Sequence, residues 1–155
     1  MRMRTLSLVA VMILAVPAGT WAQSDPTVGT WKLNLAKSKY NAGQPPKSST
    51  VVIAAAGQGI KLTSDTVLAD GTARKISYTA TYDGKDAVVT GTPDYDGMSL
   101  KKTANGVEGS RKKAGKVVQT YTRVVSADGK TMTVTSTGTT ATGGKVDNVQ
   151  VYDKQ

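Results

Sequence analysis

Apolar and polar residues alternate at every second position along much of the chain, which is the periodicity of a β-strand. No stretch carries a sustained apolar repeat of 3.6 residues, so the pattern predicts strands rather than long helices. The predicted strands cover residues 28–35, 49–56, 59–67, 72–82, 86–91, 97–103, 106–113, 116–126, 130–138 and 146–153.

Turn signals separate these strands. Asp-Gly and Asn-Gly pairs tolerate the positive φ of a tight hairpin turn. They occur at Asp70-Gly71, Asp83-Gly84, Asp96-Gly97, Asn105-Gly106 and Asp128-Gly129. The one long connection, residues 36–48, contains two prolines and a glycine, which allow at most one or two helical turns. Because the other connections are short, each strand is expected to pair antiparallel with the next.

Sequential strands in one small domain favour closure into an up-and-down barrel, because closure removes both free edges of the sheet. We therefore predict an all-β fold: a single antiparallel barrel of about eight to ten strands, with at most one short helix and with residues 36–48 at one mouth. The alternative is a two-sheet sandwich, which ordinarily uses longer crossing connections.

Alternation also predicts which side chains face the barrel interior. The first strand places Trp31, Leu33 and Leu35 on its apolar face. One face of residues 72–82 carries Arg74, Ile76, Tyr78, Ala80 and Tyr82.

The turn at Asp128-Gly129 decides the orientation of residues 116–126. A two-residue turn pairs Arg123 with Val134 and Tyr121 with Ser136, which points Tyr121 and Arg123 inward. A three-residue loop with a glycine bulge would turn both side chains outward. The two-residue turn is the preferred interpretation.

Residues 1–22 have the pattern of a cleaved signal peptide, since a basic start precedes an apolar segment from Leu6 to Val16 and small residues lead to Ala22. A retained apolar helix is the alternative. The chain has no cysteine, and therefore neither a disulfide nor a lipoprotein attachment site. No later apolar segment is long enough to span a membrane. We expect a periplasmic or secreted protein in which residues 23–155 form one domain.

The residue types limit the available chemistry. Histidine and cysteine are absent, which excludes a Ser-His-Asp arrangement, a thiolate nucleophile and the usual zinc ligands. Asp94 and Asp96 loosely follow the spacing of a calcium-binding loop but lack its remaining ligands. We expect no catalytic residue, no metal and no cofactor, and hence no enzyme. A hydrolase that uses two carboxylates is an alternative without a motif to support it.

Without the two arginines of the signal segment, the net charge is +7. Six basic residues fall on three consecutive predicted strands and define a basic surface patch: Lys101, Lys102, Arg111, Lys112, Lys113 and Lys116. A solvated face that keeps the sheet from aggregating explains such a cluster. The functional alternative is a docking patch for an anionic component of the cell envelope. Export argues against nucleic acid as a partner.

Gly29-Thr30-Trp31 opens the first predicted strand and resembles the Gly-x-Trp motif of the calycins, which include the lipocalins and fatty-acid-binding proteins. The resemblance extends over residues 26–155 and includes the chain length, the long first loop and the sequential strands. The Gly-Thr-Trp-Lys-Leu-Asn start and the Asp-Gly-Lys turns more narrowly resemble small exported bacterial proteins described as lipocalin-like, which have no established activity. The resemblance implies that Trp31 closes the barrel floor beneath a basic residue from a late strand, for which Arg123 is the candidate. The second lipocalin motif is absent, and residues 36–48 are too short for a two-helix lid.

The predicted interior consists mostly of Val, Ala, Ile, Leu and Met and contains no Phe, so the barrel is expected to enclose a cavity. We expect an exported binding protein for a small, largely apolar or lipid-like ligand, which could carry an anionic head. The candidate ligand-binding residues are Arg74, Tyr78, Tyr121 and Arg123. The alternative is a non-catalytic interaction or scaffold protein of the envelope that uses the basic surface patch. The oligomeric state is not predicted.

Overall fold

The computed structural model describes residues 25–155, and the predicted signal peptide at residues 1–22 lies outside them. These residues form strands with one short 3₁₀ turn, η1. The elements are β1 (Gly29–Leu33), η1 (Leu35–Lys37), β2 (Lys39–Tyr40), β3 (Ser48–Ala56), β4 (Gly59–Val67), β5 (Ala73–Thr81), β6 (Ala87–Thr90), β7 (Gly97–Thr103), β8 (Gly106–Lys113), β9 (Lys116–Val125), β10 (Thr131–Thr139) and β11 (Lys145–Lys154).

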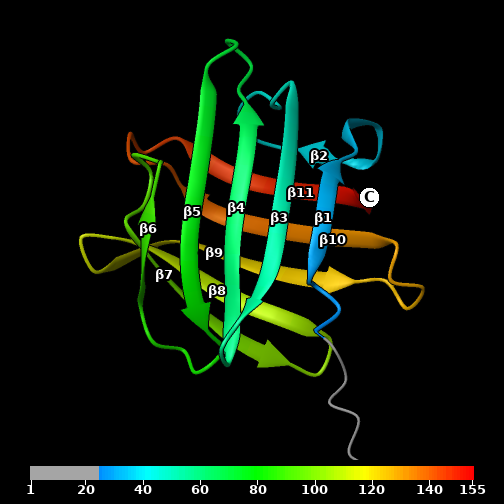
Figure 1. The fold of residues 1–155 in the computed structure, drawn as a ribbon. Coiled ribbons are helices and arrows are strands. Elements are labelled where there is room, and N and C mark those ends of the chain that lie inside the picture. Colours follow the sequence, from blue (N-terminus) through cyan, green and yellow to red (C-terminus); the bar gives the residue numbers. More distant parts are fainter. Residues whose placement is uncertain (1–24) are drawn as a thin grey trace, which may run out of the picture.

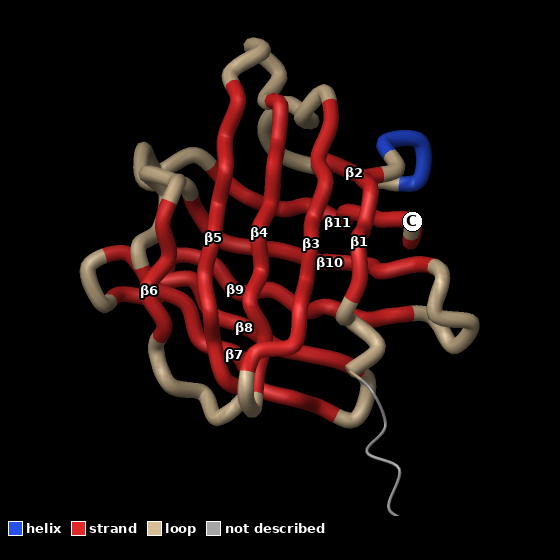
Figure 2. The backbone as a smooth tube through the Cα atoms, in the orientation of Figure 1, coloured by secondary structure: helices blue, strands red, loops and turns tan. Residues whose placement is uncertain are grey.

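The strands form one closed antiparallel barrel. From β3 to β11 each strand pairs with the next, β1 pairs with β3, and the pairing of β1 with β11 closes a ring of ten strands. The two-residue strand β2 adds to β11. Figure 1 shows β1, β3, β4 and β5 crossing steeply over β8 to β11, so the barrel has two broad faces. The predicted all-β, up-and-down barrel is confirmed, and Figure 2 shows strand around the whole ring and the helical turn beside β1.

The predicted strand boundaries agree with the observed ones to within two residues. Asp83-Gly84 lies within residues 82–86, which join β5 to β6, whereas Asp96 ends the 91–96 connection and Gly97 begins β7. A further tight turn between β8 and β9 uses Ala114 and Gly115, whose φ values are 49° and 77°. Positive φ at both central residues is the conformation of a type I′ hairpin turn.

The register at Asp128-Gly129 is the predicted one. Arg123 lies opposite Val134, and Tyr121 lies opposite Ser136. Residues directly opposite each other in an antiparallel pair share a face of the sheet. Tyr121, Arg123 and Ser136 are all buried, so the inward interpretation of both candidate residues is confirmed.

Trp31 lies at the end of the barrel where the described chain begins, and its side chain is 0% exposed. Its Nε1 donates a hydrogen bond of 2.8 Å to the carbonyl oxygen of Thr27. The cation over its ring is Lys154 of β11, with Nζ 5.1 Å from the ring centroid. The expectation that Arg123 supplies this cation is therefore wrong, because the register places Lys154 directly opposite Trp31.

The segment before β1 covers this floor of the barrel. The Tyr82 hydroxyl donates to the Asp25 carboxylate at 2.5 Å, and the Asp25 carboxylate also accepts from the hydroxyl and backbone N–H of Thr27. Residues 25–28 are therefore tied both to the end of β5 and, through Thr27, to Trp31.

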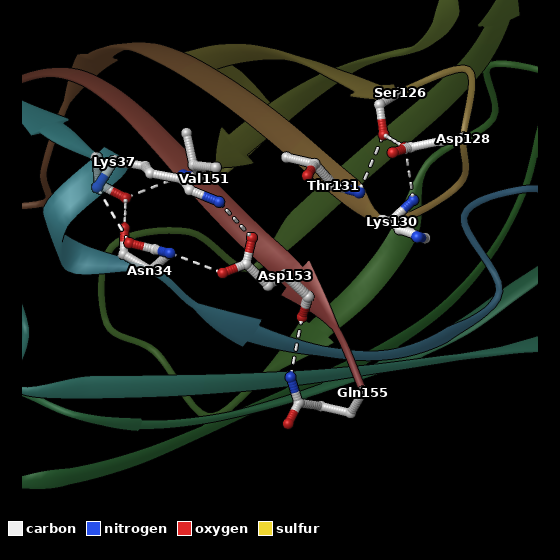
Figure 3. A network of polar contacts seen from close by, with 10 residues as sticks. Asn34, Lys37, Ser126, Asp128, Lys130, Thr131, Val151, Asp153 and Gln155 are labelled. Atoms are coloured by element: carbon white, nitrogen blue, oxygen red, sulfur yellow. Dashed lines mark hydrogen bonds and ion pairs between the residues drawn. The ribbon is translucent and has the colours of Figure 1, made fainter.

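At the other end of β1, the chain turns away from the interior. Leu35 was expected to face inward, but it begins η1 and is 42% exposed. Figure 3 shows the polar contacts that hold this turn to β11: Asn34 Nδ2 donates to Asp153 at 2.7 Å, and the Lys37 ammonium pairs with the same carboxylate at 3.1 Å. These contacts reinforce the junction of β1 with β11 that closes the ring.

Candidate ligand cavity

The barrel encloses a cavity of about 190 Å³. Ten of the sixteen lining side chains carry a polar group, so the interior is more polar than the sequence suggested. The lining residues are Ser49, Val51, Leu62, Ser64, Thr66, Ile76, Tyr78, Tyr95, Met98, Arg111, Tyr121, Arg123, Met132, Val134, Gln150 and Tyr152.

Arg123 points into this cavity from β9 and is 3% exposed. Its Nη2 donates to the Tyr78 hydroxyl at 3.0 Å, and its guanidinium carbon lies 5.7 Å from the centroid of the Tyr121 ring. Within residues 25–155, its Nε and Nη1 are buried and have no hydrogen-bond partner. Three of the four predicted ligand-binding residues, Tyr78, Tyr121 and Arg123, thus lie together in the cavity wall.

A second arginine in the cavity, Arg111 of β8, was not among the predicted ligand-binding residues. Its guanidinium carbon lies 4.6 Å from the centroid of the Tyr121 ring and 5.2 Å from that of Tyr95. Arg111 Nη1 donates to Gln119 Oε1 at 2.8 Å, whereas its buried Nε has no partner in the described chain. The assignment of Arg111 to the basic surface patch is therefore wrong.

The alternation of β8 contains the signal that locates Arg111. Val107, Gly109 and Arg111 are spaced by two and share a face, and Val107 is buried. Gly109 belongs to the same arrangement, because a Cβ added there would lie 2.4 Å from the Tyr121 ring. The ring of Tyr121 therefore lies against the wall at Gly109 and supports the Arg111 guanidinium.

The charge of the two arginines is not balanced inside the cavity, since none of the lining residues is an aspartate or glutamate. Burial alone would lower the pKa of Arg123, but the phenol oxygens of Tyr78 and Tyr121 outweigh it and raise the pKa above its ordinary value. Burial also raises the pKa of Tyr121. At neutral pH the cavity therefore presents the positive charge of Arg123 beside the neutral phenol of Tyr121.

The fourth predicted ligand-binding residue, Arg74, lies elsewhere. Its Nη1 pairs with Asp94 at 3.1 Å, and it lines an outer groove between residues 40–46 and the turns after β4 and β10. Arg74 does not line the cavity, so its predicted place beside Tyr78 is wrong. Thr66 and Gln150 line both the groove and the cavity, which identifies this end of the barrel as the entrance. The segment 36–48 lies at this mouth, as predicted.

The basic surface patch is largely neutralised. Ion pairs join Lys102 to Asp25 at 3.7 Å, Lys112 to Asp86 at 2.6 Å and Lys113 to Asp96 at 3.6 Å. With Arg111 inside the barrel, the exposed members that make no ion pair within residues 25–155 are Lys101 and Lys116.

Acidic residues of the described chain accept hydrogen bonds that hold turns and strand ends in place. The Asp94 carboxylate, considered for a calcium loop, accepts from Arg74 and from the backbone N–H of Ala141 at 3.1 Å each. No group of three or more His, Cys, Asp or Glu residues in the range 25–155 is placed to hold a metal ion. In the same range no helix is long and apolar enough to cross a membrane.

Comparisons with known proteins give a structural similarity only. No protein-family model and no curated protein matches the sequence. The chain is similar to a crystal structure of zebrafish ileal bile acid-binding protein complexed with cholic acid, with a TM-score of 0.49 and 13% sequence identity over 84% of this chain and 99% of that one. This similarity assigns neither a family nor a ligand to the chain.

Proposed function

We propose that this protein binds a small anionic organic molecule inside its barrel, with Arg123 and Arg111 holding the anionic group. The observation that carries the proposal is the pair of arginines in a cavity lined by no carboxylate, with three buried guanidinium nitrogens that lack a partner within residues 25–155. An ionised side chain taken out of water without a counter-charge costs several kcal/mol. A bound carboxylate or phosphate would offset that cost, since guanidinium groups bind both in a bidentate manner.

The neighbouring tyrosines support the same role. Tyr78 accepts a hydrogen bond from Arg123 Nη2, and a phenol that accepts one hydrogen bond can also donate its own hydrogen to a ligand oxygen. The guanidinium carbons of Arg111 and Arg123 lie 4.6 Å and 5.7 Å from the centroid of the Tyr121 ring, so one aromatic ring is close to both. The arginines are thereby held in place before a ligand arrives, which lowers the entropic cost of binding.

We further propose that the protein works outside the cytoplasm, on the strength of the signal-peptide pattern in residues 1–22. The absence of histidine and cysteine and the lack of a paired carboxylate motif favour binding over catalysis. Intact-mass analysis of the protein recovered from the periplasm or medium would test export, since cleavage after Ala22 leaves a chain that begins at Gln23.

The binding proposal is tested by calorimetric titration with benzoate, octanoate, phenyl phosphate and hexadecanoate. Arg123→Met keeps an unbranched, flexible side chain, shorter than that of arginine, and removes the charge. We expect affinity for the anions to fall about 10- to 100-fold, the loss of one or more hydrogen bonds to a charged group. The same variant should unfold at an equal or higher urea concentration without ligand, because a buried charge has been replaced by an apolar group.

Arg74→Met is the matched control, since it removes an arginine at the mouth that is already paired with Asp94. It should leave anion affinity within about twofold of the parent protein. Binding of every anion with the same affinity in Arg123→Met as in the parent, or binding of none of them, would show that the proposal is wrong.

A further inference from the structure

A group of three hydroxyls lines the cavity near its entrance, on the wall formed by β3 and β4. The Oγ of Ser49 lies 2.8 Å from Thr66 Oγ1 and 3.5 Å from Ser64 Oγ, and Ser64 and Thr66 are 3.2 Å apart. Ser49 is 4% exposed, so this cluster of three hydroxyls belongs to the interior of the barrel and not to its surface. The strand register places Ser49 opposite Thr66, and Ser64 is two residues from Thr66 on the same face.

The inward-facing sides of β3 and β4 are apolar closer to the floor of the barrel. Along β4 the inward positions before Ser64 are Ile60 and Leu62, and along β3 those after Ser49 are Val51 and Ile53, all of them buried. The cavity wall therefore changes from aliphatic at the floor to hydroxylated at the mouth. Aliphatic residues at all these positions would have made a simpler core, because buried hydroxyls must find hydrogen-bond partners.

The three hydroxyls satisfy one another only in part. Together they have three donors and six acceptor lone pairs, and three mutual contacts use at most three of each. The contact between Ser49 and Ser64 is at the 3.5 Å limit, so it is the weakest of the three. The group can therefore both accept a hydrogen bond from a molecule in the cavity and, by giving up the weak contact, donate one.

The position of this group along the barrel differs from that of Arg123. Ser49 and Thr66 lie one residue from the mouth ends of β3 and β4, whereas Arg123 lies two residues from the floor end of β9. A ligand whose anionic group is bound at Arg123 would therefore extend its other end toward the hydroxyls.

The cavity volume limits the length of such a ligand. A cavity of about 150 Å³ holds benzene, and pockets for drug-sized ligands range from about 300 to 1,000 Å³. By the same ratio, a cavity of about 190 Å³ matches a molecule of roughly eight non-hydrogen atoms. A long acyl chain would not fit within it.

We infer that the ligand is a compact hydroxy acid, with its anionic group at Arg123 and a hydroxyl bound by Ser49, Ser64 and Thr66. This inference rests on the proposed function and adds the second polar group and the size limit. The three hydroxyls would act as specificity-determining residues, since a site built to hydrogen-bond a hydroxyl discriminates against the analogue that lacks it.

The test compares acids that differ by one hydroxyl. The parent protein is titrated with benzoate, 3-hydroxybenzoate, 4-hydroxybenzoate and hexadecanoate. At least one hydroxybenzoate should bind about three- to tenfold more tightly than benzoate, as expected for one additional neutral hydrogen bond. Hexadecanoate should bind more weakly than benzoate and more weakly than the hydroxybenzoates.

The variants Thr66→Val and Ser49→Ala should each reduce or abolish the preference for the hydroxylated acid over benzoate. Thr120→Val is the matched control, because Thr120 and Thr137 form a similar hydroxyl pair at 3.2 Å on the exposed outer face. Thr120→Val should keep the preference.

Benzoate binding as tightly as both hydroxybenzoates, tighter binding of hexadecanoate, or no binding of any hydroxybenzoate would overturn this inference. In each of these cases the proposed function would still stand if one of the anions benzoate, octanoate, phenyl phosphate or hexadecanoate bound to the parent protein and bound more weakly to Arg123→Met. Anion binding that does not depend on Arg123, or none at all, would instead refute the proposed function.

Discussion

Replacing Trp31 with alanine tests whether this residue closes the barrel floor. The side chain is fully buried, and removing a buried tryptophan or phenylalanine costs about 3–5 kcal/mol. The Thr27 carbonyl also loses the donor that lies 2.8 Å away, which adds about 0.5–1.5 kcal/mol. The expected total, about 3.5–6.5 kcal/mol, is a large part of the 5–15 kcal/mol that stabilises an ordinary domain.

The measurement is urea unfolding followed by far-ultraviolet circular dichroism, since Trp31→Ala removes the only tryptophan after residue 22. In the parent protein the emission of Trp31 should be blue-shifted and should move to the red on unfolding. Trp31→Phe retains most of the apolar area but not the N–H donor, so it should lose less than Trp31→Ala. Val88→Ala is the control for a site on the surface, because Val88 is 77% exposed and should change stability by no more than about 0.5 kcal/mol.

A loss of less than about 1 kcal/mol in Trp31→Ala would refute the assignment of Trp31 to a packed floor. Ligand titration gives a second test of its position. Trp31 does not line the cavity, so an acid that enters from the mouth should change its emission only weakly. Strong quenching by that acid would place Trp31 in the binding site and contradict the arrangement described above.

Two further predictions follow from particular contacts. Gly109→Ala should destabilise the protein by about 1–3 kcal/mol in urea unfolding and weaken anion binding in calorimetry, because the new Cβ would lie 2.4 Å from the Tyr121 ring. Gly97→Ala is the control: the nearest neighbours of a Cβ there lie at 3.8 Å, so it should change neither stability nor binding. Burial, followed by the hydrogen bond to Asp25, raises the pKa of Tyr82 to about 12, so the stability it contributes is complete below pH about 10 and is lost as the pH rises through about 12. Urea midpoints measured from pH 9 to 12 should therefore fall in the parent protein and fall less in Tyr82→Phe; an equal decline in both would contradict the assignment.

Local sequence signals predicted most of the fold because the barrel is made of sequential hairpins. The register of β9 against β10 depends on the single turn at Asp128-Gly129. The sequence left two registers open there, and the preferred one, which points Tyr121 and Arg123 inward, is the one observed. Leu35 shows where alternation stops being informative: it continues the pattern of Trp31 and Leu33, yet the chain has already entered η1. Nothing in the alternation itself marks the residue at which a strand ends.

Contacts between distant segments could not be predicted in this way. The closure of the ring pairs Trp31 with Lys154, and the pairing of Arg74 with Asp94 depends on how the turn after β6 folds back. Each of these contacts corrected a residue assignment made from sequence. Lys154 replaces Arg123 as the cation over Trp31, and Arg74 is held at the mouth by an acid twenty residues further along the chain.

Arg111 shows why a run of charges is a poor guide to a surface within a barrel strand. Its neighbours Lys112 and Lys113 make the segment look solvent-facing, and composition over a short window assigns all three to one patch. The strand, however, separates adjacent residues onto opposite faces, and the irregular pairing between Arg111 and Lys112 changes the register at that point. The position of Arg111 relative to the buried Val107 therefore decides its environment, whereas the average charge of the segment does not. The same alternation accounts for the position of both arginines: each occupies an inward position on its strand, and Tyr78 and Tyr121 occupy inward positions beside them.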